Sequence, residues 1–115
     1  MIIENAGLKG LKSDLAHLDE VTEKLGFFRG QWESYRATYD YKMTDKNGTD
    51  EYYLRINSRV ESGKLENPYS ILVLTETYIG KTSFPHGLDY DAPIPPSILK
   101  EAQDKIAKLK QLLAE

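Results

Sequence analysis

The stretch YRATYDYKMTDKNGTDEYYLRINSRV, residues 35–60, decides the fold. Apolar and polar side chains alternate along both of its arms, and a period of two is the pattern of a half-buried β-strand. With Trp32 added at the start, the pattern predicts one strand over residues 32–43 and another over residues 52–60. Between them lies Asn47-Gly48, the strongest short signal for a hairpin with a type I′ turn. The stretch therefore predicts an antiparallel hairpin.

The turn also predicts the register of this hairpin. Counting outward from Asn47-Gly48 places five pairs on the apolar face: Met43 with Tyr52, Tyr41 with Leu54, Tyr39 with Ile56, Ala37 with Ser58, and Tyr35 with Val60. The same count places three pairs on the polar face: Asp40 with Arg55, Thr38 with Asn57, and Arg36 with Arg59. A slip of one residue would turn one strand's apolar side to water, so the pattern and the turn agree. The small pair Ala37 and Ser58 indicates close approach of a helix, with a pocket beneath that helix as the alternative.

Two amphipathic helices flank the strands. The first is predicted over residues 12–25, where an apolar residue recurs every three or four positions: Leu11, Leu15, Leu18, Val21 and Leu25. Ser13 is expected to cap its first turn, and Gly26 is expected to end it. The second helix begins at Pro95-Pro96, since proline is favoured in a first helical turn. Its apolar stripe consists of Leu99, Ala102, Ile106, Leu109 and Leu113.

The rest of the chain completes a small mixed fold. A third strand is predicted over residues 69–79, where the apolar run 71–74 needs cover on both faces. Residues 2–8 are a candidate fourth, N-terminal edge strand, and residues 80–93 are expected to form a long loop. Three successive strands exclude a doubly wound parallel sheet. We predict one α+β domain over residues 1–115, an antiparallel β-meander with two amphipathic helices packed on one face.

Composition narrows the class of protein. The chain has 115 residues and no cysteine, which excludes a disulfide scaffold, a thiolate metal site and a cysteine nucleophile. Its net charge of −3 argues against nucleic acid as a partner. The longest stretch without a charged residue, 67–75, is far shorter than the roughly 20 residues of a membrane span. The first residues also lack the basic region of a signal peptide, so a cytoplasmic location is expected.

Short segments spread along nearly the whole chain resemble a known family. They are Gly7-Leu8, Leu18-Asp19-Glu20, Arg29-Gly30-Gln31-Trp32, Thr38-Tyr39-Asp40, Tyr53-Leu54-Arg55, Gly80-Lys81, Pro85-His86-Gly87 and Asp89-Tyr90. Their order and spacing resemble the YugN-like family of small bacterial proteins. The chain departs from the family pattern in its Pro95-Pro96 pair and its lysine-rich last helix. The resemblance implies a compact cytoplasmic α+β protein and carries over no activity and no catalytic residue.

The sequence lacks the short motifs that are typical of catalytic and cofactor-binding sites. There is no serine elbow and no phosphate-cradling glycine loop. His86, Asp89 and Asp91 are close together but match no spacing typical of metal ligands. No catalytic residue, metal or cofactor is therefore predicted. His86 itself lies between Pro85 and Gly87, and we expect it to pin the loop to the sheet by hydrogen bonding a backbone carbonyl.

The polar face of the sheet is the first candidate site. It carries aromatic and arginine side chains, which are enriched in binding hot spots: Trp32, Arg36, Tyr53, Arg55 and Arg59. The directly opposed Arg36 and Arg59 repel each other unless an anion or a partner's carboxylate joins them. The leading hypothesis is a non-enzymatic interaction module that self-associates as a homodimer, or binds another protein, through this face or through the last helix. The competing interpretation is a solvated face crossed by local ion pairs.

The long loop is the second candidate site. A small-molecule binder, or an enzyme, could place its pocket under residues 80–93. His86 would then act as the acid–base or hydrogen-bonding group, Lys81 would contact an anion, and Asp89 or Asp91 would orient the histidine. This alternative is less favoured than the interaction module.

Overall fold

The central hairpin adopts the predicted register. The computed structural model describes residues 1–46, 48–83 and 87–115, without the side chains of Gln31 and Trp32. Strand β3 (Arg36–Thr44) pairs with β4 (Glu51–Ser62), and the four inward pairs from Ala37–Ser58 to Met43–Tyr52 are those expected. The predicted type I′ turn includes Asn47, which lies outside the described residues. Beside it, the Asp45 amide donates to the Asp50 carbonyl at 3.1 Å and closes the hairpin.

The sheet is larger than the predicted three strands. It also contains β1 (Lys12–Asp14), β2 (Phe28–Glu33), β5 (Ile71–Ser83) and β6 (Gly87–Asp89). The strand order is β1-β5-β4-β3-β2, with β6 on β5, and all pairs are antiparallel. The single strand predicted over residues 32–43 was wrong at its start. A turn at residues 34–35 reverses the chain there, so Trp32 belongs to β2 and pairs with Ala37.

Three separate segments share the outer edge of β5. Strand β1 pairs with its beginning, Ile2 forms an isolated bridge to Tyr78, and β6 pairs with its end. The N-terminal edge strand predicted over residues 2–8 is therefore limited to that bridge. Residues 80–93 are not one loop, because residues 80–83 extend β5 and β6 returns along it. In the second case, pairing with β5 gives the short segment 87–89 an extended conformation that its own sequence does not specify.

The two helices begin and end at recognisable caps. Helix α1 (Leu15–Lys24) starts later than predicted, because residues 12–14 pair with β5. Its N-cap is Asp14 and not Ser13, and the Asp14 carboxylate accepts from the His17 amide at 2.7 Å. Gly26 follows the helix with φ of +92°, as expected for a C-terminal glycine. Helix α2 (Pro96–Leu113) starts at the predicted proline pair.

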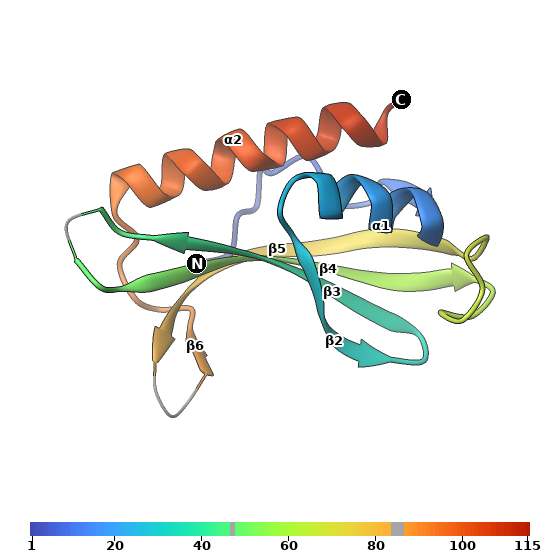
Figure 1. Cartoon of the computed structure of the whole chain (residues 1–115), viewed down its shortest axis with the longest axis horizontal. Coiled ribbons are helices and arrows are strands. Elements are labelled where there is room, and N and C mark those ends of the chain that lie inside the picture. The colour runs from blue at the N-terminus through green and yellow to red at the C-terminus, as the bar shows by residue number, and fades with distance from the viewer. Residues whose placement is uncertain (47, 84–86) are drawn as a thin grey trace.

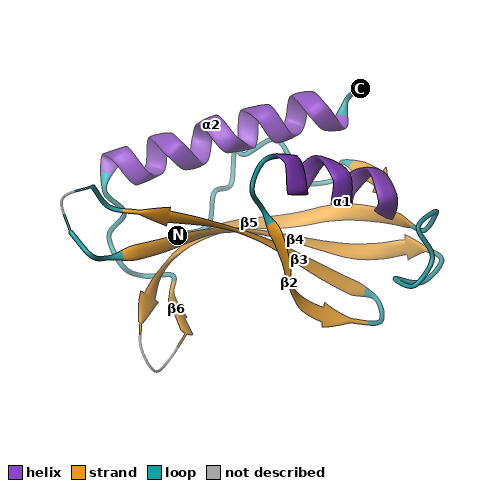
Figure 2. Ribbon diagram, viewed as in Figure 1, coloured by secondary structure: helices purple, strands orange, loops and turns teal. Residues whose placement is uncertain are grey.

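Both helices lie above the sheet in Figures 1 and 2. Strands β1 and β2 form opposite edges of the main sheet, and α1 contacts both, so the sheet is curled around the helix and not flat. Tyr39, Leu54 and Ile56 on the sheet are buried with Leu18 of α1 and Leu109 of α2. The core therefore fills the space between the helices and the predicted apolar face.

One predicted core residue lies outside this core. Tyr35 is 56% exposed, because it occupies the turn between β2 and β3 and shares only a backbone bond with Val60. The small pair lies at the predicted opposed positions. Ala37 and Ser58 are both buried, and the Ser58 hydroxyl donates to the Ala37 carbonyl at 2.9 Å.

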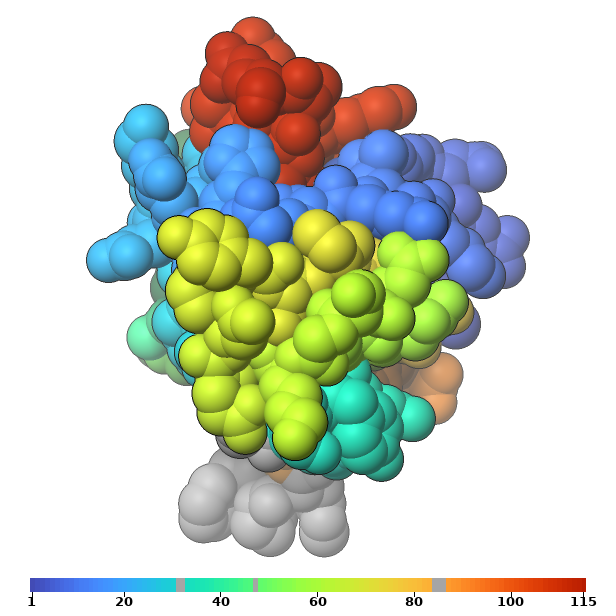
Figure 3. Space-filling model, turned by 90° about the vertical axis from the view of Figure 1, so that its right-hand side faces the viewer, coloured from blue at the N-terminus to red at the C-terminus, as the bar shows by residue number. Residues whose placement is uncertain are grey.

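The loop after β4 closes the end of the molecule where α1 begins. The amides of Leu15 and Ala16 donate to the carbonyls of Ser70 and Pro68. Figure 3 shows this loop, in yellow and yellow-green, packed below the blue α1. No helix among the described residues is long and apolar enough to cross a membrane.

Candidate binding face of the sheet

We call the side of the sheet that faces away from the helices the outer face. One row of residues runs across four strands there: Phe28, Asp40, Arg55 and Tyr78. Arg55 Nε and Nη2 donate to the two carboxylate oxygens of Asp40 at 2.9 and 3.0 Å. This bidentate hydrogen bond raises the pKa of the Arg55 guanidinium further above its ordinary value. The Asp40 side chain is only 7% exposed, so the pair is a structural element of the face.

Tyr90, just after β6, completes this row. Arg55 Nη1 donates to the Tyr90 hydroxyl at 2.8 Å, and the Tyr78 and Tyr90 rings lie 5.1 Å apart. Gly80 makes room for this arrangement, because a Cβ there would lie 2.9 Å from the Leu88 Cβ and 3.2 Å from the Tyr90 ring. Arg55 is thus held by Asp40 of β3 and by Tyr90 after β6, and it is not available as a free cation.

A polar cleft lies further along the outer face. We call it the arginine cleft; it has a volume of about 340 Å³ and is lined by Glu33, Arg36, Thr38, Asn57, Ser58, Arg59, Thr75 and Glu76. Arg36 and Arg59 occupy directly opposed register positions, as predicted. In the next row the Thr38 hydroxyl donates to Asn57 Oδ1 at 3.3 Å. The register between β4 and β5 shifts beside Asn57, and Thr75 and Glu76 of β5 border the cleft at this irregularity.

The charges of the arginine cleft are only partly compensated. Among the residues that the structure describes, no ion pair joins Arg36 or Arg59 to a carboxylate. Glu76 faces Lys9 at 3.7 Å. The Arg36 guanidinium lies 5.5 Å from the centroid of the Tyr35 ring. Both arginines are exposed, so their donors reach solvent.

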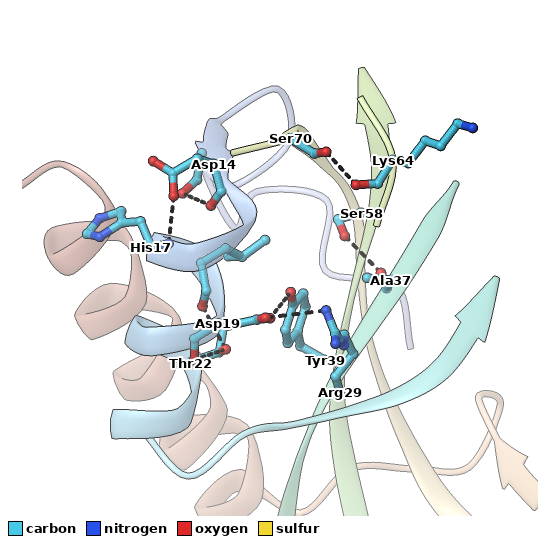
Figure 4. A network of polar contacts seen from close by, with 12 residues as sticks. Asp14, His17, Asp19, Thr22, Arg29, Ala37, Tyr39, Ser58, Lys64 and Ser70 are labelled. Carbon is cyan, nitrogen blue, oxygen red and sulfur yellow. Dashed lines mark hydrogen bonds and ion pairs between the residues drawn. The ribbon is translucent and has the colours of Figure 1, made fainter. Parts of the chain in front are cut away.

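A second polar network, on the helix side, was not predicted from the sequence. The Tyr39 hydroxyl donates to Asp19 Oδ1 at 2.7 Å, and Arg29 Nη1 donates to Asp19 Oδ2 at 3.3 Å (Figure 4). Burial, reinforced by the bond to Asp19, raises the pKa of the Tyr39 phenol. The network ties α1 to β2 and β3. Its only sequence signal was that all three residues lie in the segments that resemble the family.

The structure brings together some of the predicted site residues and separates others. Arg36 and Arg59 share the arginine cleft, while Tyr53 packs edge-on against Phe28, with ring centroids 6.3 Å apart. Lys81 pairs with Asp50 at 3.5 Å and faces Tyr52, which is a core residue. His86 and the Trp32 side chain lie outside the described part of the chain. Within that part, no cluster of side chains could hold a metal ion.

Known proteins with similar sequence or structure form a consistent set. Residues 4–100 match the model of the YugN-like family. A curated relative, Uncharacterized protein YlbA of Bacillus subtilis (strain 168), is 37% identical over 86 residues, which are 74% of this chain and 70% of the relative. The crystal structure of uncharacterized conserved protein YugN from Geobacillus kaustophilus HTA426 is 34% identical, with a TM-score of 0.84 over 99% of this chain and 95% of that one.

Proposed function

The chain belongs to the YugN-like family, and we propose that it is a non-enzymatic binding module that self-associates through the outer face of its sheet. The polar groups of the central row are already engaged with one another, Asp40 with Arg55 and Arg55 with Tyr90. Groups held in this way stabilise the face and present it rigidly. They are poorly placed to exchange protons with a substrate.

The charge pattern of the arginine cleft is the observation that carries this proposal. Glu33 and Arg36 face each other across β2 and β3, and Arg59 lies on the next strand. In a dimer with twofold symmetry each residue meets the other copy's patch, so a patch with both signs of charge can complement itself. The carboxylate of Glu33 in one copy can then neutralise Arg59 in the other. A patch of one sign would instead repel its copy.

Exposed aromatic rings on β2 and in the β2–β3 turn supply apolar area for such an interface. Phe28 on β2 is 51% exposed, and Tyr35 in the adjoining turn is 56% exposed. Rings of this kind, together with arginine, dominate the energy of many interfaces. The two longer dimensions of the molecule are 42 and 30 Å. A face of that size leaves room for the roughly 800 Å² per copy of a standard interface.

The test is sedimentation of the whole chain at micromolar concentration and low salt. We expect a dimer for the natural chain and a monomer for Arg59→Glu and for Glu33→Arg at the same concentration, because each reversal opposes like charges. An equimolar mixture of the two variants should form a heterodimer, since each supplies the charge that the other needs. Lys24→Glu, which changes an exposed cation on α1, serves as the control and should remain dimeric. A natural chain that is monomeric throughout this range would overturn the proposal.

A further inference from the structure

Arg36 and Arg59 form a like-charge pair across β3 and β4, whereas the neighbouring rows of these strands pair complementary side chains. The two rows beside it pair Thr38 with Asn57 and Asp40 with Arg55. Directly opposed side chains on an antiparallel pair have their Cβ atoms about 5 Å apart, and like charges at that separation destabilise the sheet. Nothing in the fold requires a second cation at this position, because the backbone ladder forms whatever the side chain is. An anion seated between the two guanidinium groups would relieve this repulsion.

The lining of the cleft supplies donors for an oxyanion. Each guanidinium offers five N–H groups in a planar fork that matches a phosphate or a carboxylate. Asn57 accepts from Thr38 through its oxygen, and its amide nitrogen has no hydrogen-bond partner among the described residues. The volume of about 340 Å³ lies within the range of small-molecule sites. A compact anion between the two guanidinium groups would thus find charge and directed donors together.

The two acidic side chains at the cleft determine what kind of anion fits. Glu76 is engaged by Lys9 at 3.7 Å, and Glu33 is exposed at the end of β2. Their negative charges repel an extended polyanion, which would have to pass over both. A single phosphate or carboxylate group seated between the arginines avoids them.

We propose that the arginine cleft is a binding site for a compact oxyanion, a phosphate or carboxylate group of a small molecule. The same donors would hold the carboxylates of the second copy in the dimer. A bound oxyanion therefore competes with self-association, and this regulatory consequence rests on the proposed function. Binding of the anion by one copy does not depend on it.

Inorganic phosphate is the first probe, titrated into the ¹⁵N-labelled chain with ionic strength held constant by sodium chloride. We expect saturable shifts of the amide signals of Arg36, Asn57 and Arg59. Arg59→Gln should weaken the affinity by roughly tenfold or more, because it removes charge-assisted hydrogen bonds. Lys24→Gln removes an exposed cation far from the cleft and should leave the affinity unchanged. Arg59→Lys tests whether the planar guanidinium group is needed, since lysine keeps the charge but cannot form bidentate hydrogen bonds.

Two results would overturn the site. One is the absence of saturable shifts with phosphate and with sodium acetate, the second probe. The other is an affinity that Arg59→Gln leaves unchanged. Saturable binding of phosphate without acetate restricts the ligand class to phosphate groups, and binding of acetate as well extends the class to carboxylates.

Sedimentation in sodium phosphate and in sodium chloride of equal ionic strength tests the competition. A dimer that dissociates in phosphate supports it, and a dimer that persists when phosphate saturates the cleft overturns it. If the chain is monomeric in chloride, the proposed function fails, while the titration still decides whether the anion site exists.

Discussion

Asp40 and Arg55 lie directly opposite each other on β3 and β4 and are joined by two hydrogen bonds of 2.9 and 3.0 Å. The carboxylate is nearly buried, and the guanidinium continues to Tyr90 on the far side of β5. One pair of side chains thus connects the centre of the outer face to the strand at its edge.

Breaking this pair should destabilise the fold. Asp40→Asn leaves the Arg55 cation without its carboxylate, and we expect the free energy of unfolding to fall by about 2–3 kcal/mol. Urea denaturation measures the loss. Lys42→Gln is the matched control, because it removes an exposed pair with Glu51 and should cost much less. Equal losses for the two variants would contradict the structural role of the Asp40–Arg55 pair.

The unfolding free energy should fall at high pH through Tyr41. Burial, together with a hydrogen bond to Glu101, raises the pKa of Tyr41 from 10.0 to about 12. The unfolded chain therefore loses this proton first as the pH rises, so the contribution is complete below pH 10 and disappears through pH 12. Urea denaturation across this range should give a steeper decline for the natural chain than for Tyr41→Phe. An identical decline in both chains would count against the shift.

Leu8 is the deepest of several anchors of the N-terminal segment, since Ile3 and Ala6 pack against the core only partly buried. Leu8 is fully buried in the core, while Ile2 is 56% exposed. Leu8→Ala should lower the free energy of unfolding by about 2–5 kcal/mol, through lost burial and a cavity. Ile2→Ala removes a similar volume from the surface and should cost less than about 0.5 kcal/mol. Thermal unfolding of both variants checks the difference, and a Leu8→Ala chain as stable as the natural one would show that this anchor is dispensable.

Removing one arginine from the cleft should stabilise the free chain. Arg59→Gln relieves the repulsion from Arg36, and we expect a gain of about 0.2–1 kcal/mol in dilute buffer at low salt. Added sodium chloride should abolish the gain by screening. Differential scanning calorimetry below the dimerisation range measures both effects. A loss of stability in Arg59→Gln would mean that Arg59 is structurally engaged and that the pair is not repulsive.

Much of the fold followed from local patterns. The alternation over residues 35–60 is repeated on both arms, so only one register keeps the apolar side chains on one face, and the structure has that register from Ala37–Ser58 to Met43–Tyr52. The first helix was less well predicted, since its apolar spacing continues into residues that pair with β5. The short strands β1, β2 and β6 carried no signal of their own. Each is extended because another strand supplies its hydrogen bonds, β5 for β1 and β6, and β3 for β2.

The candidate site was likewise predictable only in part. The opposition of Arg36 and Arg59 was predicted by counting residues outward from the turn, because the backbone ladder determines which residues face each other. The same count placed Arg55 opposite Asp40, but the contact of Arg55 with Tyr90 could not be predicted, since Tyr90 reaches it only after the chain has formed β5 and turned back through β6. The Asp19 network was hidden for the same reason, as α1 meets β2 and β3 only in the folded protein.

The sequence by itself determined which side chains point to the core and which to the outer face, because a period of two leaves no other choice in a paired strand. Only the tertiary structure decided which outward cations are neutralised and which are left facing solvent. Asp40 holds Arg55 across the hairpin and Tyr90 joins it from β6, whereas no carboxylate reaches Arg36 or Arg59 within the described residues. Charge compensation depends on distances between segments far apart in the chain, and these distances exist only once the sheet has curled.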